Sequence, residues 1–147
     1  MNIEIAKSAG FCFGVNRAVQ TVMELVKKPP TNTAIYTIGN LIHNPQIIAQ
    51  LEKGGIRSVG ADEIDALFEQ CDECHQIILI IRAHGIEKHT NERLLSYQKA
   101  KPAFHIIDCT CPYVKKIHHI VQENVKPGSA LVVIGNRDHP EVKGILS

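Results

Sequence analysis

The sequence has 147 residues, a formal net charge of +1 and 44% hydrophobic residues, which is enough for one ordinary domain with its own core. This balance, without a basic or acidic block, argues against nucleic acid or an anionic membrane surface as a main partner. The chain shows neither a membrane-spanning apolar run nor a signal peptide, so we expect no membrane partner and a cytoplasmic location. Five cysteines in such a chain favour metal ligation or redox chemistry over disulfides.

Strands and helices are predicted to alternate along the chain, with apolar residues at strand or helix spacing and turn residues between them. The expected strands are 2–6, 33–38, 56–59, 76–81, 103–107 and 130–134. The expected helices are 15–26, 45–53, 61–70, 87–99, 112–125 and a last one from residue 140. The run 76–81 is apolar without alternation, as in a central parallel strand. We therefore predict an α/β fold of repeated βαβ units with parallel sheets.

The stretch Ala9–Arg17 holds Cys12 between two glycines, where a predicted strand meets a helix. Unpaired N–H groups and the positive end of the helix dipole favour a thiolate there, which suits a metal ligand or a nucleophile. Gly10 and Gly14 would let the backbone come close to a bulky inorganic or phosphate group. The alternative for a single cysteine is a buried apolar side chain in a helix-entry turn.

Five potential ligands follow predicted strands within a few residues. In parallel α/β folds, ligands bind beyond the carboxyl ends of the strands. We therefore expect one shared crevice that is lined by Cys12, His43, His84, Cys111 and His139.

A weak internal repeat relates the segments around Cys12 and Cys111. Both are predicted as strand, cysteine loop and helix, and aligning the cysteines places Val15 on Val114. Two thiolates presented from helix starts would suit a shared metal centre. Two amphipathic helices can also agree at a few positions by chance.

The remaining cysteines match other motifs. Residues 71–75 have the C-x-x-C-H form that attaches c-type haem, but haem attachment belongs to exported proteins. Cys71 and Cys74 could instead bind zinc together with Cys109 and Cys111, although the second pair is C-x-C. We expect instead that residues 71–75 form an exposed loop before a buried strand, with incidental thiols.

Thiolates that are ringed by histidines suggest a cluster whose free iron meets an anionic substrate, because histidines and helix N-termini suit a phosphate or diphosphate. Glu141 lies two residues after His139, and a carboxylic acid there could deliver a proton. The alternative for Glu141 is a solvated residue in the first turn of a helix. A phosphate-binding α/β domain without metal is a further alternative for the chain.

Taken together, these motifs resemble the 4-hydroxy-3-methylbut-2-enyl diphosphate reductase family, iron–sulfur oxidoreductases of the non-mevalonate pathway of isoprenoid biosynthesis. The combination and order of the pieces are more specific than any single piece, and they span essentially the whole chain. The matching pieces are Gly10–Ala18, Ile42–Asn44, Ala83–Ile86, Asp108–Pro112 and Gly135–Val142.

The resemblance implies a 4Fe-4S cluster on three cysteines, with Cys12 and Cys111 as the first two ligands. It implies that His43 and His84 contact the substrate diphosphate. His139 would lie near the substrate hydroxyl or diphosphate, and Glu141 would supply the proton relay. The implied reaction is a reductive dehydroxylation to isopentenyl and dimethylallyl diphosphate, with electrons from ferredoxin or flavodoxin.

The family places three α/β units around a pseudo-threefold axis. The resemblance implies that residues 1–108 form the first unit and that residues 109–147 begin the second, with the third unit absent. The third cluster cysteine would then lie beyond Ser147. We therefore expect this chain to be the N-terminal part of a longer enzyme.

Overall fold

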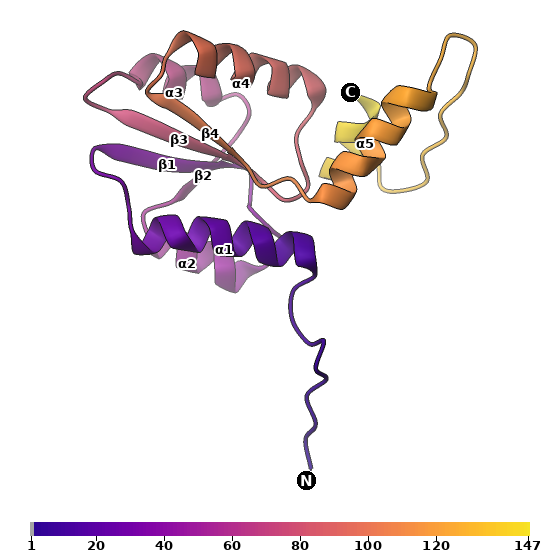
Figure 1. The fold of residues 1–147 in the computed structure, drawn as a ribbon, viewed down its shortest axis with the longest axis horizontal. Coiled ribbons are helices and arrows are strands. Elements are labelled where there is room, and N and C mark those ends of the chain that lie inside the picture. Colours follow the sequence, from indigo (N-terminus) through magenta and orange to yellow (C-terminus); the bar gives the residue numbers. More distant parts are fainter. Residues whose placement is uncertain (1) are drawn as a thin grey trace.

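The computed structural model describes residues 2–147 and contains a parallel sheet of four strands in the order β2-β1-β3-β4 (Figure 1). The α/β class and the alternation of strands and helices predicted from the sequence are confirmed. The strands are β1 Thr33–Ile38, β2 Arg57–Val59, β3 Gln76–Ile81 and β4 Phe104–Asp108. The helices are α1 Phe13–Lys27, α2 Pro45–Lys53, α3 Ile64–Gln70, α4 Lys88–Ala100, α5 Pro112–Asn124 and α6 Pro140–Leu146.

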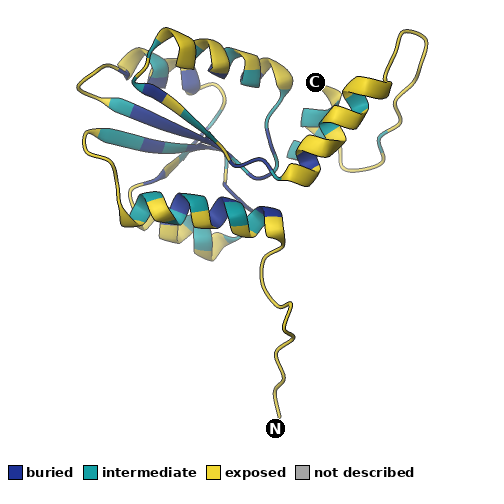
Figure 2. Cartoon of the chain, in the orientation of Figure 1, coloured by how far each residue is buried: buried dark blue, intermediate teal, exposed yellow. Residues whose placement is uncertain are grey.

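Helices cover both faces of the sheet, with α1 and α2 on one face and α3 and α4 on the other (Figure 1). Side chains of β3 alternate between the two layers. Ile78 and Ile80 pack into the core under α1 and α2, whereas Ile77, Leu79 and Ile81 pack into the core under α3 and α4. Since both faces of β3 are buried (Figure 2), its sequence shows no polar alternation.

The sheet order creates a switch point between β1 and β3. β1 leads to β2 on one side, while β3 lies on the other side of β1 and pairs with β4. The helices that follow β1 and β3 therefore lie on opposite faces of the sheet (Figure 1), and a ligand site is expected at the carboxyl ends of these strands. After β1, Asn44 stops the loop as the N-cap of α2, because its side chain accepts a hydrogen bond of 3.1 Å from the N–H of Ile47.

Two predicted strands are wrong. Residues 2–6 and 130–134 form no strand, and their apolar side chains are exposed, with Ile5 at 81% and Ile134 at 96%. A strand needs a neighbour for its backbone N–H and C=O groups. Within residues 2–147, neither segment pairs with the sheet, so the apolar pattern alone does not produce a strand.

The last two helices lie beyond the carboxyl end of the sheet and pack against each other (Figure 1). Helix α5 begins at Pro112 as predicted, but Val114 is its one buried residue. Ile117 and Ile120 are 43% and 47% exposed. Large apolar side chains of this helix are therefore left uncovered within residues 2–147.

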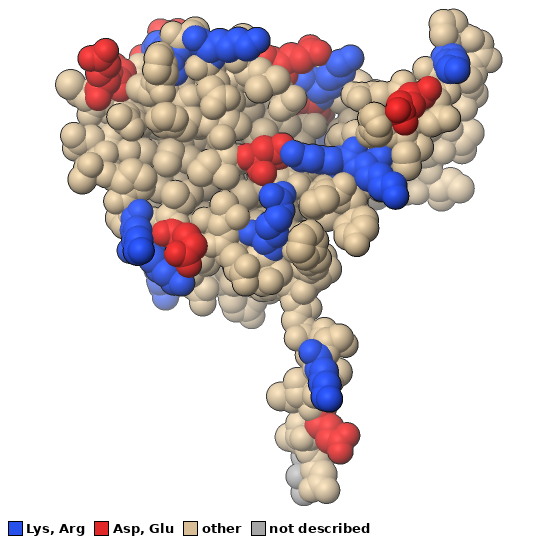
Figure 3. Space-filling view, in the orientation of Figure 1, with Lys and Arg blue, Asp and Glu red and all other residues tan. Residues whose placement is uncertain are grey.

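Charged side chains of both signs are interspersed on the face shown in Figure 3. Among the helices of residues 2–147, each is too short or too polar to traverse a lipid bilayer.

Candidate functional site

Three of the predicted site histidines meet at the carboxyl end of the sheet. His43 follows β1, His84 follows β3, and His139 is the N-cap of α6. The ring centroids of His43 and His84 are 4.4 Å apart, and the His139 ring lies 5.9 Å from the first and 5.6 Å from the second. One ring nitrogen from each lies within 4.8 Å of the other two, so the three could bind one anion or one metal ion together.

Backbone contacts between the two strand-end loops hold His43 and His84 in place. The N–H of Ala83 donates to the carbonyl of Leu41 at 3.2 Å, which joins the loop after β3 to the loop after β1. The turn that carries His84 closes through Gly85, whose φ of 78° lies in the left-handed region.

Arg82 stabilises the same turn by a hydrogen bond to its backbone. Its Nε donates to the carbonyl of Gly85 at 3.2 Å, and its guanidinium lies over Gly39 in the loop after β1. A Cβ on Gly39 would be 2.6 Å from Arg82 Nη1. The φ of 63° favours glycine at position 39, and a side chain there would displace the Arg82 guanidinium.

His84 is held in its neutral form. Burial, as the largest cause, and the neighbouring His43, Arg82 and His139 together lower its pKa to about 4. Its Nδ1 is buried and has no hydrogen-bond partner within residues 2–147. A buried nitrogen without a partner is costly, so this atom is suited to a ligand that supplies the missing hydrogen bond.

His139 is oriented by the start of its own helix. Its Nδ1 accepts a hydrogen bond of 3.3 Å from the N–H of Glu141, so the proton of the neutral ring is on Nε2. Glu141 lies in the first turn of α6 and is half-buried. The structure therefore places both residues at one helix start, beside the other two histidines.

Cys12 and Cys111 occupy equivalent positions at the starts of two neighbouring helices. Cys12 is the N-cap of α1 and is exposed, and Cys111 is the N-cap of α5 and is half-buried. The Sγ of Cys111 packs directly against Gly14 of α1, where it occupies the space that a Cβ would need. The N–H of Cys111 donates to the carbonyl of Ala83 at 2.9 Å, which connects this cysteine to the loop of His84.

The donor chemistry of these two cysteines fits an iron–sulfur cluster. Both thiols are free, and neither sulfur caps its helix. Helix N-termini stabilise thiolates, which are the ligands of such clusters. The absence of a side chain at Gly14 leaves room for the Cys111 sulfur, so the two residues fit as part of a ligand set.

The remaining cysteines lie apart from each other, which overturns the zinc alternative. Cys71 is buried in the core under α3 and α4, whereas Cys109 is buried in the core under α1 and α2. Cys74 is exposed in the loop before β3, at the opposite end of the sheet from Cys111. Burial raises the pKa of Cys109 to about 11, so its thiol stays protonated at neutral pH.

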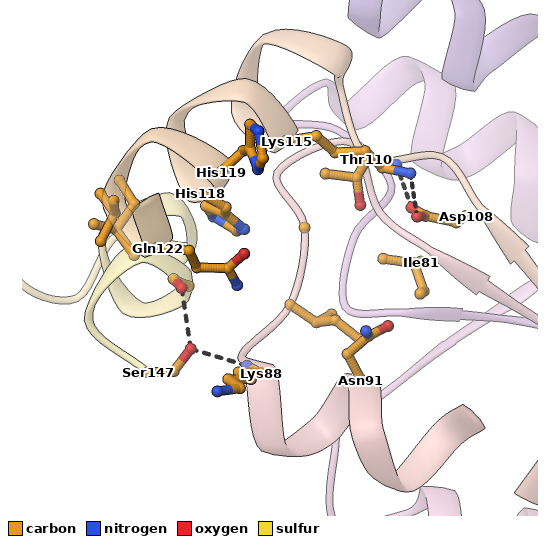
Figure 4. Close-up of a pocket in the computed structure, with 15 residues that line it drawn as sticks. Ile81, Lys88, Asn91, Asp108, Thr110, Lys115, His118, His119, Gln122 and Ser147 are labelled. Atoms are coloured by element: carbon orange, nitrogen blue, oxygen red, sulfur yellow. Dashed lines mark hydrogen bonds and ion pairs between the residues drawn. The ribbon is translucent and has the colours of Figure 1, made fainter. Parts of the chain in front are cut away.

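A cavity of about 370 Å³ lies behind the turns that carry His84 and Cys111, between the sheet, α4, α5 and α6 (Figure 4). Gly85 and Thr110 line it. Lys115 and Asp108 meet at its edge, where Nζ lies 2.5 Å from the carboxylate. None of the predicted site residues lines this cavity.

Two arginines near the site were not predicted from the sequence. Arg82 braces the loop of His84, and Arg17 of α1 donates from Nη2 to the carbonyl of Thr110 at 2.7 Å. Arg17 lies three residues after Gly14 on the same helix, and this spacing could have indicated that it faces the same neighbour. Residue spacing gives no comparable signal for Arg82.

Comparisons with known proteins identify the family and the relatives that this chain resembles. The model of the family described as "LytB protein" matches residues 3–147. The chain is 43% identical over 145 residues to the 4-hydroxy-3-methylbut-2-enyl diphosphate reductase of Thermoanaerobacter sp. (strain X514), which covers 99% of this chain and 46% of the relative. It is 42% identical over 146 residues to the reductase of the same name from Clostridioides difficile (strain 630). This match covers 99% of this chain and 47% of the relative.

Two solved structures of reductases also match this chain. A structure of (E)-4-hydroxy-3-methyl-but-2-enyl diphosphate reductase, the terminal enzyme of the non-mevalonate pathway, matches with a TM-score of 0.71 and 36% identity over 98% of this chain and 46% of that chain. The Plasmodium falciparum reductase structure matches with a TM-score of 0.75 and 33% identity. This match covers 95% of this chain and 39% of that chain. The chain thus spans about half the length of the curated relatives it matches.

Proposed function

The chain belongs to the LytB protein family, and from this premise we propose that it forms the N-terminal part of a 4-hydroxy-3-methylbut-2-enyl diphosphate reductase. The observation that carries the proposal is the convergence of His43, His84 and His139 at the end of the sheet, next to the helix starts of Cys12 and Cys111. The reaction would be the reductive dehydroxylation of this substrate to isopentenyl and dimethylallyl diphosphate.

The three histidines would bind the substrate diphosphate. In the free protein His84 is neutral, because burial and neighbouring positive charge lower its pKa. A bound diphosphate would place negative charge beside the rings and favour their protonated forms. The partnerless Nδ1 of His84 would then donate to a phosphate oxygen, and the Nε2 proton of His139 would be available for a second hydrogen bond.

Cys12 and Cys111 would hold a 4Fe-4S cluster together with a third cysteine outside residues 1–147. When bound, this cluster supplies the electrons for loss of the substrate hydroxyl. The protein's part is to present two thiolates from neighbouring helix starts and to hold the diphosphate next to them. That arrangement would fix the substrate hydroxyl relative to the reducing centre.

Glu141 would act as the proton donor. Its N–H binds the His139 ring, so the residue is tied to the ring that would contact the substrate. The hydroxyl leaves as water only after protonation, and the allylic carbanion left by the two electrons needs a proton to become either product. A carboxylic acid next to the diphosphate can deliver these protons.

The larger assembly is part of the same proposal. Residues 1–108 would form the first α/β unit, residues 109–147 would begin the second, and the rest of the protein would complete a pseudo-threefold arrangement. The uncovered apolar side chains of α5 and of 130–134 support further packing partners for this region. Ferredoxin or flavodoxin would donate the electrons, and the enzyme would work in the cytoplasm.

Anaerobic purification of the full-length enzyme tests the cluster. We expect a brown protein with iron and sulfide in equal amounts. Cys111→Ser should lose most of its iron, because one cluster ligand is removed. Cys109→Ser is the matched control and should keep its iron, because this thiol is buried in the core and stays protonated. Equal iron loss in both variants would refute the assignment of Cys111 as a ligand.

Turnover of full-length Glu141→Gln tests the proton relay. We expect a normal iron content and a kcat lowered by about 100-fold or more, which is the usual contribution of a general acid. Asp138→Asn changes an exposed carboxylate of the same segment and should leave kcat near that of the wild type. An unchanged kcat in Glu141→Gln would remove Glu141 from the proton path.

A phosphate-binding α/β domain without metal is the second candidate, and the partnerless Nδ1 of His84 favours it. Inorganic diphosphate would then protect the protein against thermal unfolding while iron and sulfide stay absent after anaerobic purification. The reductase proposal requires iron and sulfide in the same sample.

A further inference from the structure

Arg17 links the two cysteine-bearing helix starts. It lies on α1, five residues after Cys12, and its Nη2 donates to the carbonyl of Thr110 at 2.7 Å. Thr110 immediately precedes Cys111 and is 6% exposed, and this hydrogen bond from a charged donor is partly buried. Hydrogen bonds of this type contribute more to stability than neutral ones.

Three further contacts fix the rest of this turn but none of them reaches helix α1. The N–H of Cys109 donates to Ile81 and the N–H of Cys111 donates to Ala83, at 3.0 and 2.9 Å, which ties the turn to the end of β3. The N–H of Thr110 donates to the Asp108 carboxylate at 2.8 Å. Helix α1 is held to the turn by Arg17, by the contact of Gly14 with the Cys111 sulfur, and by the core that it shares with Cys109.

The guanidinium also brings a positive charge into a sulfur-rich region. Through its hydrogen bond to the carbonyl of Thr110, Arg17 places this charge next to the turn that carries Cys111. Its Nε is buried without a hydrogen-bond partner in the described part of the chain. A partnerless cationic donor next to a cysteine turn is unfavourable unless a negative charge lies nearby.

We propose that Arg17 is a positioning residue of the cluster site: it holds the turn of Cys111 against the helix of Cys12 and supplies a positive charge at that turn. This inference rests on the proposed function for one point, which is that the bound group is an iron–sulfur cluster. The separation of the two cysteines is a property of this chain and can be measured without any cluster.

The test uses the full-length protein with Arg17→Met, Arg17→Lys and the control Lys116→Met. Methionine removes the charge and the donor but keeps a long side chain, and lysine restores both in part. Lys116 is an exposed cation on α5 without an ion pair among the described residues. The readouts are the rate of iron release to a chelator, the midpoint potential of the cluster, and cross-linking of Cys12 to Cys111 by dibromobimane in the cluster-free protein.

For Arg17→Met we expect iron release about tenfold faster than in the wild type, as the loss of one charge-assisted hydrogen bond would give. We also expect a more negative midpoint potential, because a nearby cation favours the reduced cluster. Arg17→Lys should recover most of the potential, which a purely structural role would not predict. Lys116→Met should match the wild type in every readout.

Cross-linking separates failure of this inference from failure of the proposed function. A wild-type protein without iron but with efficient cross-linking of Cys12 to Cys111, reduced several-fold in Arg17→Met, would refute the reductase and keep the positioning role. Iron release, potential and cross-linking that stay at wild-type values in Arg17→Met would overturn the inference. If Arg17→Met does not fold, as judged by circular dichroism, the same comparison is made between Arg17→Lys and the wild type, with smaller changes of the same sign expected.

Discussion

Single residues decide how closely the site elements approach each other. The contact between Gly14 and the Cys111 sulfur exists because residue 14 lacks a side chain. The sequence indicated that a glycine beside Cys12 has a structural purpose, but it could not say what fills the space. The answer depends on a residue almost a hundred positions away, which a local pattern does not encode.

Gly14→Ala tests this contact. In a helix, glycine to alanine usually stabilises by about 1 kcal/mol through backbone entropy. Here the new Cβ would overlap Cys111 Sγ, so we expect a net loss of about 1–3 kcal/mol in the free energy of unfolding, as in other overpacked sites. Urea denaturation measures it, with Gln20→Ala on the exposed side of α1 as control. A stabilised Gly14→Ala variant would show that the contact is absent.

The neutral state of His84 gives a prediction for its titration. Its pKa is lowered to about 4 in the folded protein, below the usual value of about 6.5. Above pH 6.5 the ring is neutral in both the folded and the unfolded chain and contributes no pH dependence. As the pH falls from about 6.5 to 4, only the unfolded chain binds the proton, so the free energy of unfolding should decrease.

Proton NMR of the His84 ring checks this directly, with an expected midpoint near pH 4 in the free protein. Inorganic diphosphate should raise the midpoint, because negative charge favours the imidazolium. The resonances of His75, in the loop at the other end of the sheet, should not respond to diphosphate. A His84 midpoint that is unaffected by diphosphate would argue against the proposed binding role.

At the level of elements, the strands that pair with a neighbour were predicted correctly. Two segments that have no neighbour to pair with among residues 2–147 were wrongly predicted as strands. The run 76–81 and the stretch 33–38 became β3 and β1 with the predicted bounds, because each pairs with parallel neighbours along its length. The segment 130–134 is equally apolar but pairs with nothing in residues 2–147. Sequence patterns report the tendency of a segment, whereas pairing depends on which other segments are present.

Helix α2 shows that local signals suffice where the stabilising contact is local. Asn44 and Pro45 predicted the start of the helix, and the structure has the Asn44 side chain bonded to the N–H of Ile47. We expect Asn44→Ala to lower the free energy of unfolding by about 1 kcal/mol, the usual value of an N-cap. Urea denaturation measures the loss, and Gln46→Ala in the same turn should have less than half of this effect.

At the scale of the whole molecule, the topology explains why the candidate site was largely predictable. Parallel strands have their carboxyl ends at one edge, so residues that follow β1, β3 and β4 had to come together. His43, His84 and Cys111 were found this way. His139 and Cys12 were predicted from strands that do not form, and they reach the same region through the helix starts of α6 and α1.

The order of the strands also constrains how the protein is made. β3 is inserted between β1 and β4, so a growing polypeptide cannot bring His43, His84 and Cys111 together before residue 111 has left the ribosome and β4 has paired with β3. Iron that reached the nascent chain earlier would meet thiols such as Cys71 and Cys109 before they are enclosed in the core. We therefore expect iron loading of the proposed cluster site to follow the pairing of β4 with β3.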